Sequence, residues 1–173
     1  IEALKQKRHG IGKVTLFPTA LDVPVSEVKC DNEKLKQLLS LSPLQTVSRT
    51  ALLGMMAAKE ALEDAGLPMQ GTRNASQQQP LRIGFISATS VGGMDLSEHF
   101  YEAFKQDPSR GRLREVISHD CGASTELIAS YLGIRDFVTT ISTACSSAAN
   151  AVMLGARMIR HGQLDAAIVG GTD

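Results

Sequence analysis

Cys145 is the residue of this chain whose surroundings best suit covalent chemistry. It lies in Thr143-Ala-Cys-Ser-Ser147, after a β-branched and aromatic run at 137–143 and before an apolar segment that ends at His161-Gly162. This order predicts a strand, a sharp turn and a helix, which is the geometry of a nucleophile elbow. Unpaired backbone N–H groups at the start of a helix stabilise a thiolate. A buried, inert cysteine explains this local pattern equally well.

The predicted elements around this turn form a βαβ unit. A second apolar run, at 164–171, follows the helix and ends in two glycines. This succession predicts two parallel strands joined by a right-handed crossover. The run at 81–89 predicts a further strand, and its mostly apolar composition indicates a central, buried position. The fold class is therefore expected to be α/β, with a mixed, mainly parallel sheet flanked by helices.

Helices are expected before and between these strands. Asp95-Leu-Ser-Glu98 is a capping box with Asp in place of Ser or Thr, so that Asp95 is expected to cap its own helix. A glycine turn, Val91-Gly-Gly-Met94, comes directly before it. The tract at 69–80 is polar and without an apolar period, which predicts an exposed, mobile loop. The other helices are predicted at 32–41, with Asp31 or Asn32 as N-cap, at 48–65 and at 118–132.

The active-site turn, the helix after it and the glycine-rich segment at 165–173 together resemble the β-ketoacyl-acyl carrier protein synthases. These are condensing enzymes of fatty acid and polyketide synthesis, with a thiolase-like fold. The turn, the helix length and the closing glycines agree with the family in order and spacing. The resemblance implies that Cys145 is the acyl-accepting nucleophile. It also implies that the turn at 91–94 lies near the acyl pocket, although Ser87-Ala-Thr-Ser90 stands where the family has more glycine.

In this family, the cysteine takes an acyl group from a carrier-protein thioester. A malonyl thioester then decarboxylates, and the carbanion attacks the acyl-enzyme to give a 3-ketoacyl product. The backbone N–H of Cys145 is expected to supply one oxyanion donor. Two histidines and a lysine assist from the second half of the family's fold. The resemblance thus implies one ketosynthase domain over 1–173, the N-terminal half of the fold truncated at both ends, that does not condense by itself.

None of the four histidines lies in a family motif. His161 stands 16 residues beyond Cys145 on one predicted helix, about 24 Å away at about 1.5 Å per residue. This separation exceeds hydrogen-bond reach, so His161 is expected to cap the helix C-terminus instead. His9, His99 and His119 are not assigned a role by their positions in the sequence.

Composition excludes several classes of function. The chain has 18 Lys plus Arg and 18 Asp plus Glu, and no basic stripe that would bind nucleic acid. Three widely spaced cysteines, Cys30, Cys121 and Cys145, give neither a disulfide framework nor a metal-binding spacing, and they suit a reducing cytosol. No GxGxxG pattern indicates a nucleotide, and no cofactor is expected. No signal peptide or long apolar span appears, so a cytoplasmic protein without membrane contact is expected.

The expected partners are an acyl carrier protein and its acyl and malonyl thioesters. Because the family's carrier protein is acidic, Arg110, Arg112 and Arg114 are a candidate docking patch, although a solvated loop explains them equally well. Family members dimerise along the strand before the nucleophile. A homodimer, or a pair with a ketosynthase-like subunit, is therefore expected through 137–143.

Three alternatives belong to other classes. A cysteine hydrolase of the α/β-hydrolase type would need Gly-x-Cys-x-Gly, and neither flank of Cys145 is glycine. A thiolase-type acyltransferase would share the elbow and differ in the second half of the fold. A non-catalytic chain-length partner of a polyketide pair usually lacks the nucleophile, and Cys145 argues against that role.

Overall fold

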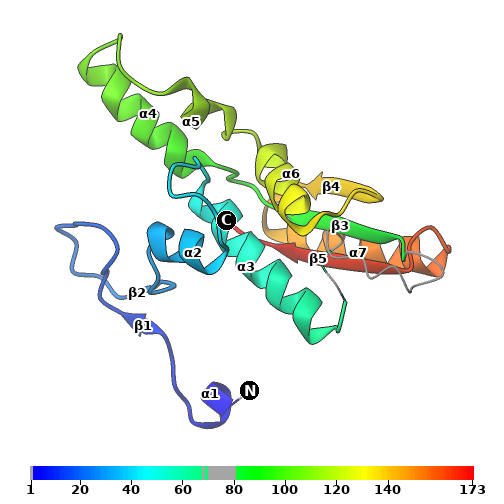
Figure 1. Ribbon diagram of the computed structural model, residues 1–173. Helices are drawn as coiled ribbons and strands as arrows, with labels where there is room; N and C mark the ends of the chain where they lie inside the picture. Colours follow the sequence, from blue (N-terminus) through cyan, green and yellow to red (C-terminus); the bar gives the residue numbers. More distant parts are fainter. Residues whose placement is uncertain (1, 68, 70–80) are drawn as a thin grey trace. The chain divides into compact units, whose positions relative to one another are not determined.

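The computed structural model describes residues 2–67, 69 and 81–173, which form two compact units, Ile1–Pro43 and Leu44–Asp173 (Figure 1). The tract at 69–80, expected to be an exposed loop, lies outside the described residues except for Met69. No helix in the described ranges is both long enough and apolar enough to cross a membrane.

The first unit contains a small antiparallel sheet and two helices. Its strands pair through Ile11 and Ser26. The predicted helix at 32–41 is present, and the Asp31 side chain caps it by accepting a hydrogen bond from Lys34 N at 2.7 Å. In chain order the elements are α1 (Glu2–Lys5), β1 (Ile11–Gly12), β2 (Val25–Ser26) and α2 (Asn32–Leu38).

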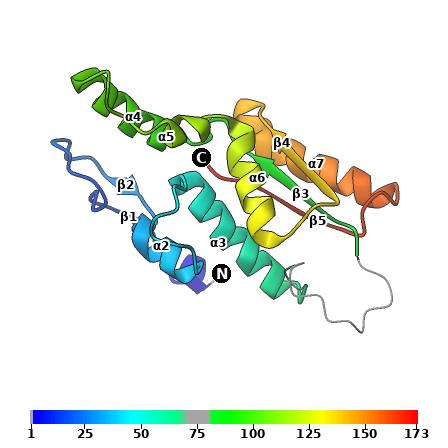
Figure 2. The same ribbon diagram turned by 45° about the horizontal axis from the view of Figure 1, so that its top comes forward.

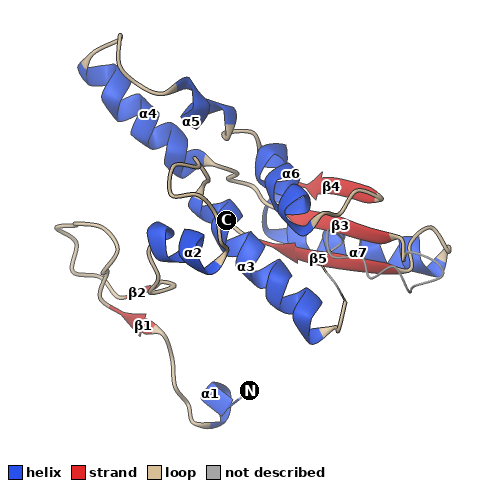
Figure 3. Cartoon of the chain, viewed as in Figure 1, coloured by secondary structure: helices blue, strands red, loops and turns tan. Residues whose placement is uncertain are grey.

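The second unit is built on a parallel sheet with strand order β4-β3-β5. All six residues of the central strand are buried, as its apolar sequence predicts. The expected α/β architecture, a parallel sheet flanked by helices, is confirmed (Figure 3). In chain order the elements are α3 (Arg49–Asp64), β3 (Ile83–Ala88), α4 (Met94–Gln106), α5 (Leu113–Ile117), α6 (Cys121–Leu132), β4 (Phe137–Ile141), the 3₁₀ turn η2 (Ala144–Ser146), α7 (Ser147–Arg160) and β5 (Ala166–Gly171).

Helices α6 and α7 cover opposite faces of this sheet (Figures 1 and 2). On the α7 face, Ile86, Ala88 and Ala151 form a buried cluster. A Cβ atom at Gly155 would lie 2.7 Å from Val169 Cγ1, so only glycine lets α7 approach β5 this closely. On the α6 face, Thr140 Oγ1 donates a hydrogen bond to Thr125 Oγ1 at 2.7 Å.

Charged side chains fix the register of the strands at their amino ends. The Arg82 guanidinium donates to Asp165 through two bonds, Nε to Oδ2 at 3.1 Å and a terminal nitrogen to Oδ1 at 2.8 Å. This hydrogen-bonded pairing lowers the pKa of Asp165 to about 2. The Asp136 carboxylate accepts a hydrogen bond from Ile83 N at 2.9 Å. Carboxylates that precede β4 and β5 therefore hold the start of β3 between them.

Several helix boundaries differ from the sequence predictions, and α2 ends at Leu38 instead of residue 41. Asp95 does not cap α4, whose N-cap is Gly93; its Oδ2 atom accepts a hydrogen bond from Arg49 N at 2.8 Å, at the start of α3. The helix predicted at 118–132 begins only at Cys121, because the Asp120 side chain accepts from Gly122 N at 2.7 Å and caps it there. The short helix α5 was not predicted.

Candidate active site

Cys145 lies at the centre of the one-turn 3₁₀ segment η2, between β4 and α7. The strand predicted at 137–143 ends at Ile141, and α7 begins at Ser147, so the thiol lies just before the α-helix. Ala144 has a φ of 52°, in the left-handed region that alanine rarely adopts. Such a conformation costs on the order of 1–2 kcal/mol and persists only where surrounding contacts impose it.

The Ser147 hydroxyl imposes much of this turn. It accepts a hydrogen bond from Thr143 N at 2.8 Å and donates one to Ala144 O at 2.7 Å. Ser147 is itself buried, which makes an unpaired hydroxyl there costly. One side chain therefore links the backbone N–H of Thr143 to the carbonyl of Ala144, on the N-terminal side of Cys145.

A second set of polar contacts closes the turn, one from α7 and one from the last residue of η2. The Asn150 amide donates from Nδ2 to Thr143 Oγ1 at 2.9 Å, and Ser146 Oγ donates to Thr143 O at 2.8 Å. The sequence analysis did not identify Ser147 or Asn150 as site residues. The available signal was three polar side chains shortly after the cysteine, at the start of a segment that is otherwise apolar.

The thiol of Cys145 is open to solvent in this chain. Cys145 is exposed, whereas Cys30 and Cys121 are partly buried, and all three are free. The small neighbours Ala148 and Ala149 are exposed as well and leave room for a substrate. Cys145 is therefore not the buried cysteine that the alternative interpretation of the sequence expects.

The three strands of the parallel sheet end side by side, at the end of the sheet where the Cys145 turn begins. Ala88 pairs with Ile141 on one side and with Gly171 on the other. One residue further, Thr89 N donates a hydrogen bond to Ile141 O at 3.2 Å. The segments that follow these strands, including the Cys145 turn, therefore begin as neighbours.

The predicted glycine turn follows β3 and packs against the start of α6. Gly92 has a φ of 62°, and a Cβ atom there would lie 2.9 Å from His119 O. A Cβ atom at Gly93 would lie 2.1 Å from Ser118 O. Both positions thus require glycine, and the turn cannot move without displacing the segment before α6.

The histidines make their hydrogen bonds with groups other than the Cys145 thiol. His161 is the C-cap residue of α7, as predicted. His119 Nδ1 is 3.0 Å from Ser97 Oγ, and both His99 and His119 are exposed. No hydrogen bond within the described residues joins a histidine to Cys145.

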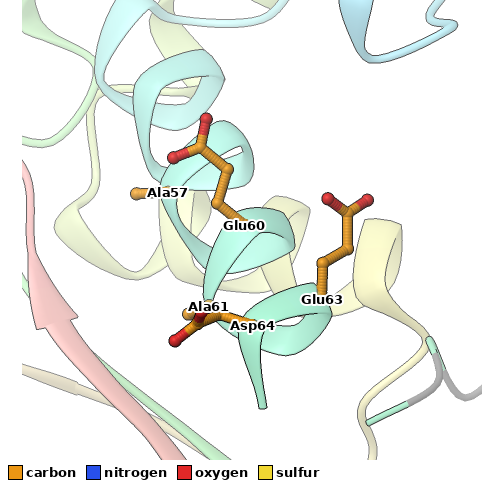
Figure 4. Close-up of a pocket in the computed structure, with 5 residues that line it drawn as sticks. All are labelled: Ala57, Glu60, Ala61, Glu63 and Asp64. Atoms are coloured by element: carbon orange, nitrogen blue, oxygen red, sulfur yellow. The ribbon is translucent and has the colours of Figure 1, made fainter. Parts of the chain in front are cut away.

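A separate acidic hollow lies on α3 and offers no comparable chemistry. Figure 4 shows it lined by Ala57, Glu60, Ala61, Glu63 and Asp64, with the three carboxyl groups standing apart from one another. Within the described ranges, no group of three or more His, Cys, Asp or Glu side chains is placed to hold a metal ion.

Fold and site together define a thiolase-like α/β protein that presents a thiol at the turn from a parallel strand into a helix. The chain belongs to the beta-ketoacyl synthase family, since the model of the beta-ketoacyl synthase N-terminal domain matches residues 3–173. The resemblance noted in the sequence is thereby confirmed.

The individual relatives include a polyketide synthase component and a 3-oxoacyl-acyl-carrier-protein synthase. The chain is 27% identical over 173 residues to a polyketide beta-ketoacyl synthase 1 of Streptomyces halstedii, across 96% of this chain and 40% of the relative. It is 29% identical over 121 residues to 3-oxoacyl-acyl-carrier-protein synthase 2 of Vibrio cholerae, across 69% of this chain and 28% of the relative.

The structure is also similar to that of the ishigamide ketosynthase/chain length factor. The TM-score is 0.81 at 25% sequence identity, and the match covers 99% of this chain and 42% of the other. The chain therefore spans about two-fifths of the length of the first of these relatives and of this solved structure.

Proposed function

We propose that Cys145 accepts an acyl group from an acyl-carrier-protein thioester, as the first step of a Claisen-type condensation. The observation that supports this most directly is the exposed thiol at the constrained strand-to-helix turn of a ketosynthase-family domain. A cysteine sulfur attacks a thioester carbonyl as a nucleophile, and an exposed thiol at this turn is accessible to such a substrate.

The step is a transfer between two sulfur atoms. The Cys145 sulfur bonds to the thioester carbonyl carbon, and the electron pair moves to the carbonyl oxygen. When the carbonyl re-forms, the bond to the carrier's sulfur breaks, and the carrier thiol leaves with the proton that Cys145 gave up. A backbone N–H at Cys145 stabilises the transient oxyanion, an interaction typically worth about 2.7–4 kcal/mol.

The second step forms a carbon–carbon bond. Loss of CO₂ from malonyl thioester leaves a carbanion, which attacks the Cys145 thioester and releases the thiolate. In the family that this chain resembles, two histidines and a lysine from the second half of the fold assist this step. Without two such donors the rate is expected to fall on the order of 10⁴-fold or more.

Three arginines, two in the segment between α4 and α5 and one in α5, are proposed to contact the acidic carrier protein. Arg110, Arg112 and Arg114 are exposed, and Arg110 also pairs with Asp107 at 3.4 Å. The acidic hollow on α3 would repel the same partner. Charge complementarity therefore favours docking at the arginines.

The proposed partner subunit binds at β4. Within the described residues β4 pairs only with β3, so its other edge is open to a strand from a second chain. The partner is a second copy or a ketosynthase-like subunit, as in the ketosynthase/chain length factor that this structure resembles.

The test is to incubate the chain with an acyl-carrier-protein thioester and to locate the acyl group by peptide mass spectrometry. We expect acylation at Cys145, loss of the adduct in Cys145→Ala and retention in the matched control Cys121→Ala. With malonyl-carrier protein added, the chain alone is expected to give no 3-ketoacyl product. Acylation at another cysteine would contradict the proposal. Failure to acylate, combined with tight binding to a ketosynthase, would favour the chain-length partner role.

A further inference from the structure

The carboxylate of Asp173 organises the turn that follows β3. Its Oδ1 atom accepts hydrogen bonds from Thr89 Oγ1 at 2.7 Å, from Ser90 N at 2.7 Å and from Val91 N at 3.2 Å. Thr89 Oγ1 in turn accepts a hydrogen bond from Gly92 N at 3.1 Å. One oxygen atom thus holds four successive residues, directly or through Thr89.

This cluster lies beside the elbow. Asp173 follows β5, and β3 lies between β5 and β4, the strand that leads to Cys145. A Cβ atom at Gly171 would lie 3.5 Å from Ala148 Cβ, so the end of β5 reaches the first turn of α7. Thr172 N also donates to Ala88 O at 3.1 Å, which extends the β5 contact past the last strand residue.

The Asp173 side chain is negatively charged, as an acceptor of several N–H and O–H hydrogen bonds should be. Burial raises the pKa of Asp173, but the hydrogen bonds from Thr89, Ser90 and Val91 outweigh it, and the net pKa is lowered. The side chain is therefore a carboxylate at neutral pH. Successive N–H groups pointing at one anion form a rigid concavity.

The turn carries one exposed apolar side chain, that of Val91. Val91, whose N–H is held by Asp173, keeps 36% of its surface exposed. On its other side the turn is fixed by the close contact of Gly93 with Ser118 O. The exposed side chain of Val91 thus belongs to a backbone segment held from both sides.

We propose that Asp173 is a positioning residue for acyl transfer to Cys145, because it holds the Thr89–Gly92 turn in place as a wall of the acyl-chain site. The inference rests on the proposed function and adds to it the group that sets the shape of this wall. Small displacements of a substrate-positioning group can cost about 10²-fold in rate.

The experiment compares Asp173→Ala and Asp173→Asn with the unmodified chain. Asp165→Asn is the matched control, because it removes a carboxylate from the opposite end of the same strand. Rates of Cys145 acylation are measured with acyl-carrier-protein thioesters of several chain lengths, alkylation by iodoacetamide is measured in parallel, and amide hydrogen exchange is followed at Ser90 and Val91.

For Asp173→Ala we expect roughly tenfold faster exchange at Ser90 and Val91 and roughly tenfold weaker discrimination among chain lengths. Iodoacetamide, which carries no acyl chain, should react at an unchanged rate. Asp173→Asn should recover much of the discrimination, since its amide oxygen still accepts N–H bonds. Asp165→Asn should match the unmodified chain in its discrimination among chain lengths.

Unchanged chain-length discrimination in an Asp173→Ala chain that still acylates would overturn the assignment of Asp173. So would a loss of iodoacetamide reactivity equal to the loss of acylation, since that pattern would show an effect on the Cys145 thiol itself and not on the acyl-chain site. An unmodified chain that is not acylated at all would instead contradict the proposed function. The exchange rates would then show only whether Asp173 holds the backbone amides of Ser90 and Val91.

Discussion

Cys145 differs from the other two cysteines in exposure and in backbone setting. It is the exposed member of the three, and it stands where a strand turns into a helix. We therefore predict that limiting iodoacetamide modifies Cys145 before Cys30 and Cys121 in the folded chain. Peptide mass spectrometry over a range of pH values measures the order of modification. Earlier labelling of Cys121, which begins α6 and is partly buried, would contradict this prediction. It would show that a position at a helix start makes a cysteine reactive even without exposure.

The residue types around Cys145 explain what the sequence could and could not predict there. The cysteine was found from the strand-turn-helix order and the family resemblance. The positive φ of Ala144 leaves no trace in the sequence, because alanine has no preference for that region. The roles of Ser147 and Asn150 depend on which backbone groups the turn brings within reach, and short polar side chains bond locally in many ways.

At the scale of elements, the Arg82–Asp165 pair gives strand register a dependence on pH. The pKa of Asp165 is about 2 in the folded chain against 3.8 ordinarily, so its contribution to stability is present above about pH 4 and is lost as pH falls toward 2. We predict that Asp165→Asn is less stable than the unmodified chain near neutral pH and that this difference closes between pH 4 and 2.

Urea unfolding at several pH values measures the difference between the two chains, which cancels the titration of other carboxylates. Because the pair is exposed, the difference should be small and should shrink further in high salt. A difference that stays constant from pH 5 to 2 would show that the charge of Asp165 does not matter.

The types of the long elements were predictable, whereas their ends and the short elements such as α5 were not. Apolar runs gave all three strands of the parallel sheet, since buried strands leave a strong compositional signal. Asp95 shows why ends fail. Its position three residues before a glutamate fits a local cap, yet its carboxylate bonds to Arg49 N, 46 residues away in sequence. Tertiary contacts of this kind have no local signature.

On the scale of the whole chain, the exposed apolar surface predicts self-association. One face of α7 packs on the sheet, while Val152 at 53% and Met153 at 48% are exposed on the rest of the helix. Leu113 and Ile117 on α5 are about three-quarters exposed. Exposed apolar groups in such number generally mark interfaces.

Sedimentation velocity over a range of concentrations should show dimers or larger species. Amide exchange at 137–141 should slow as concentration rises if the open edge of β4 is the contact. A monomer at high concentration would contradict the prediction, and association without protection of β4 would move the interface to α7 or α5.

The last strand, β5, has a bound carboxylate beyond each of its ends. Asp165 is held by a guanidinium before the strand, and Asp173 by backbone amides after it. A strand can slide in its sheet only in steps of two residues if its faces are to stay matched, and either step would pull both carboxylates from their partners. The position of β5 along the neighbouring strand is therefore fixed at both of its ends. Motions of the sheet are expected to leave the spacing between these two ends unchanged.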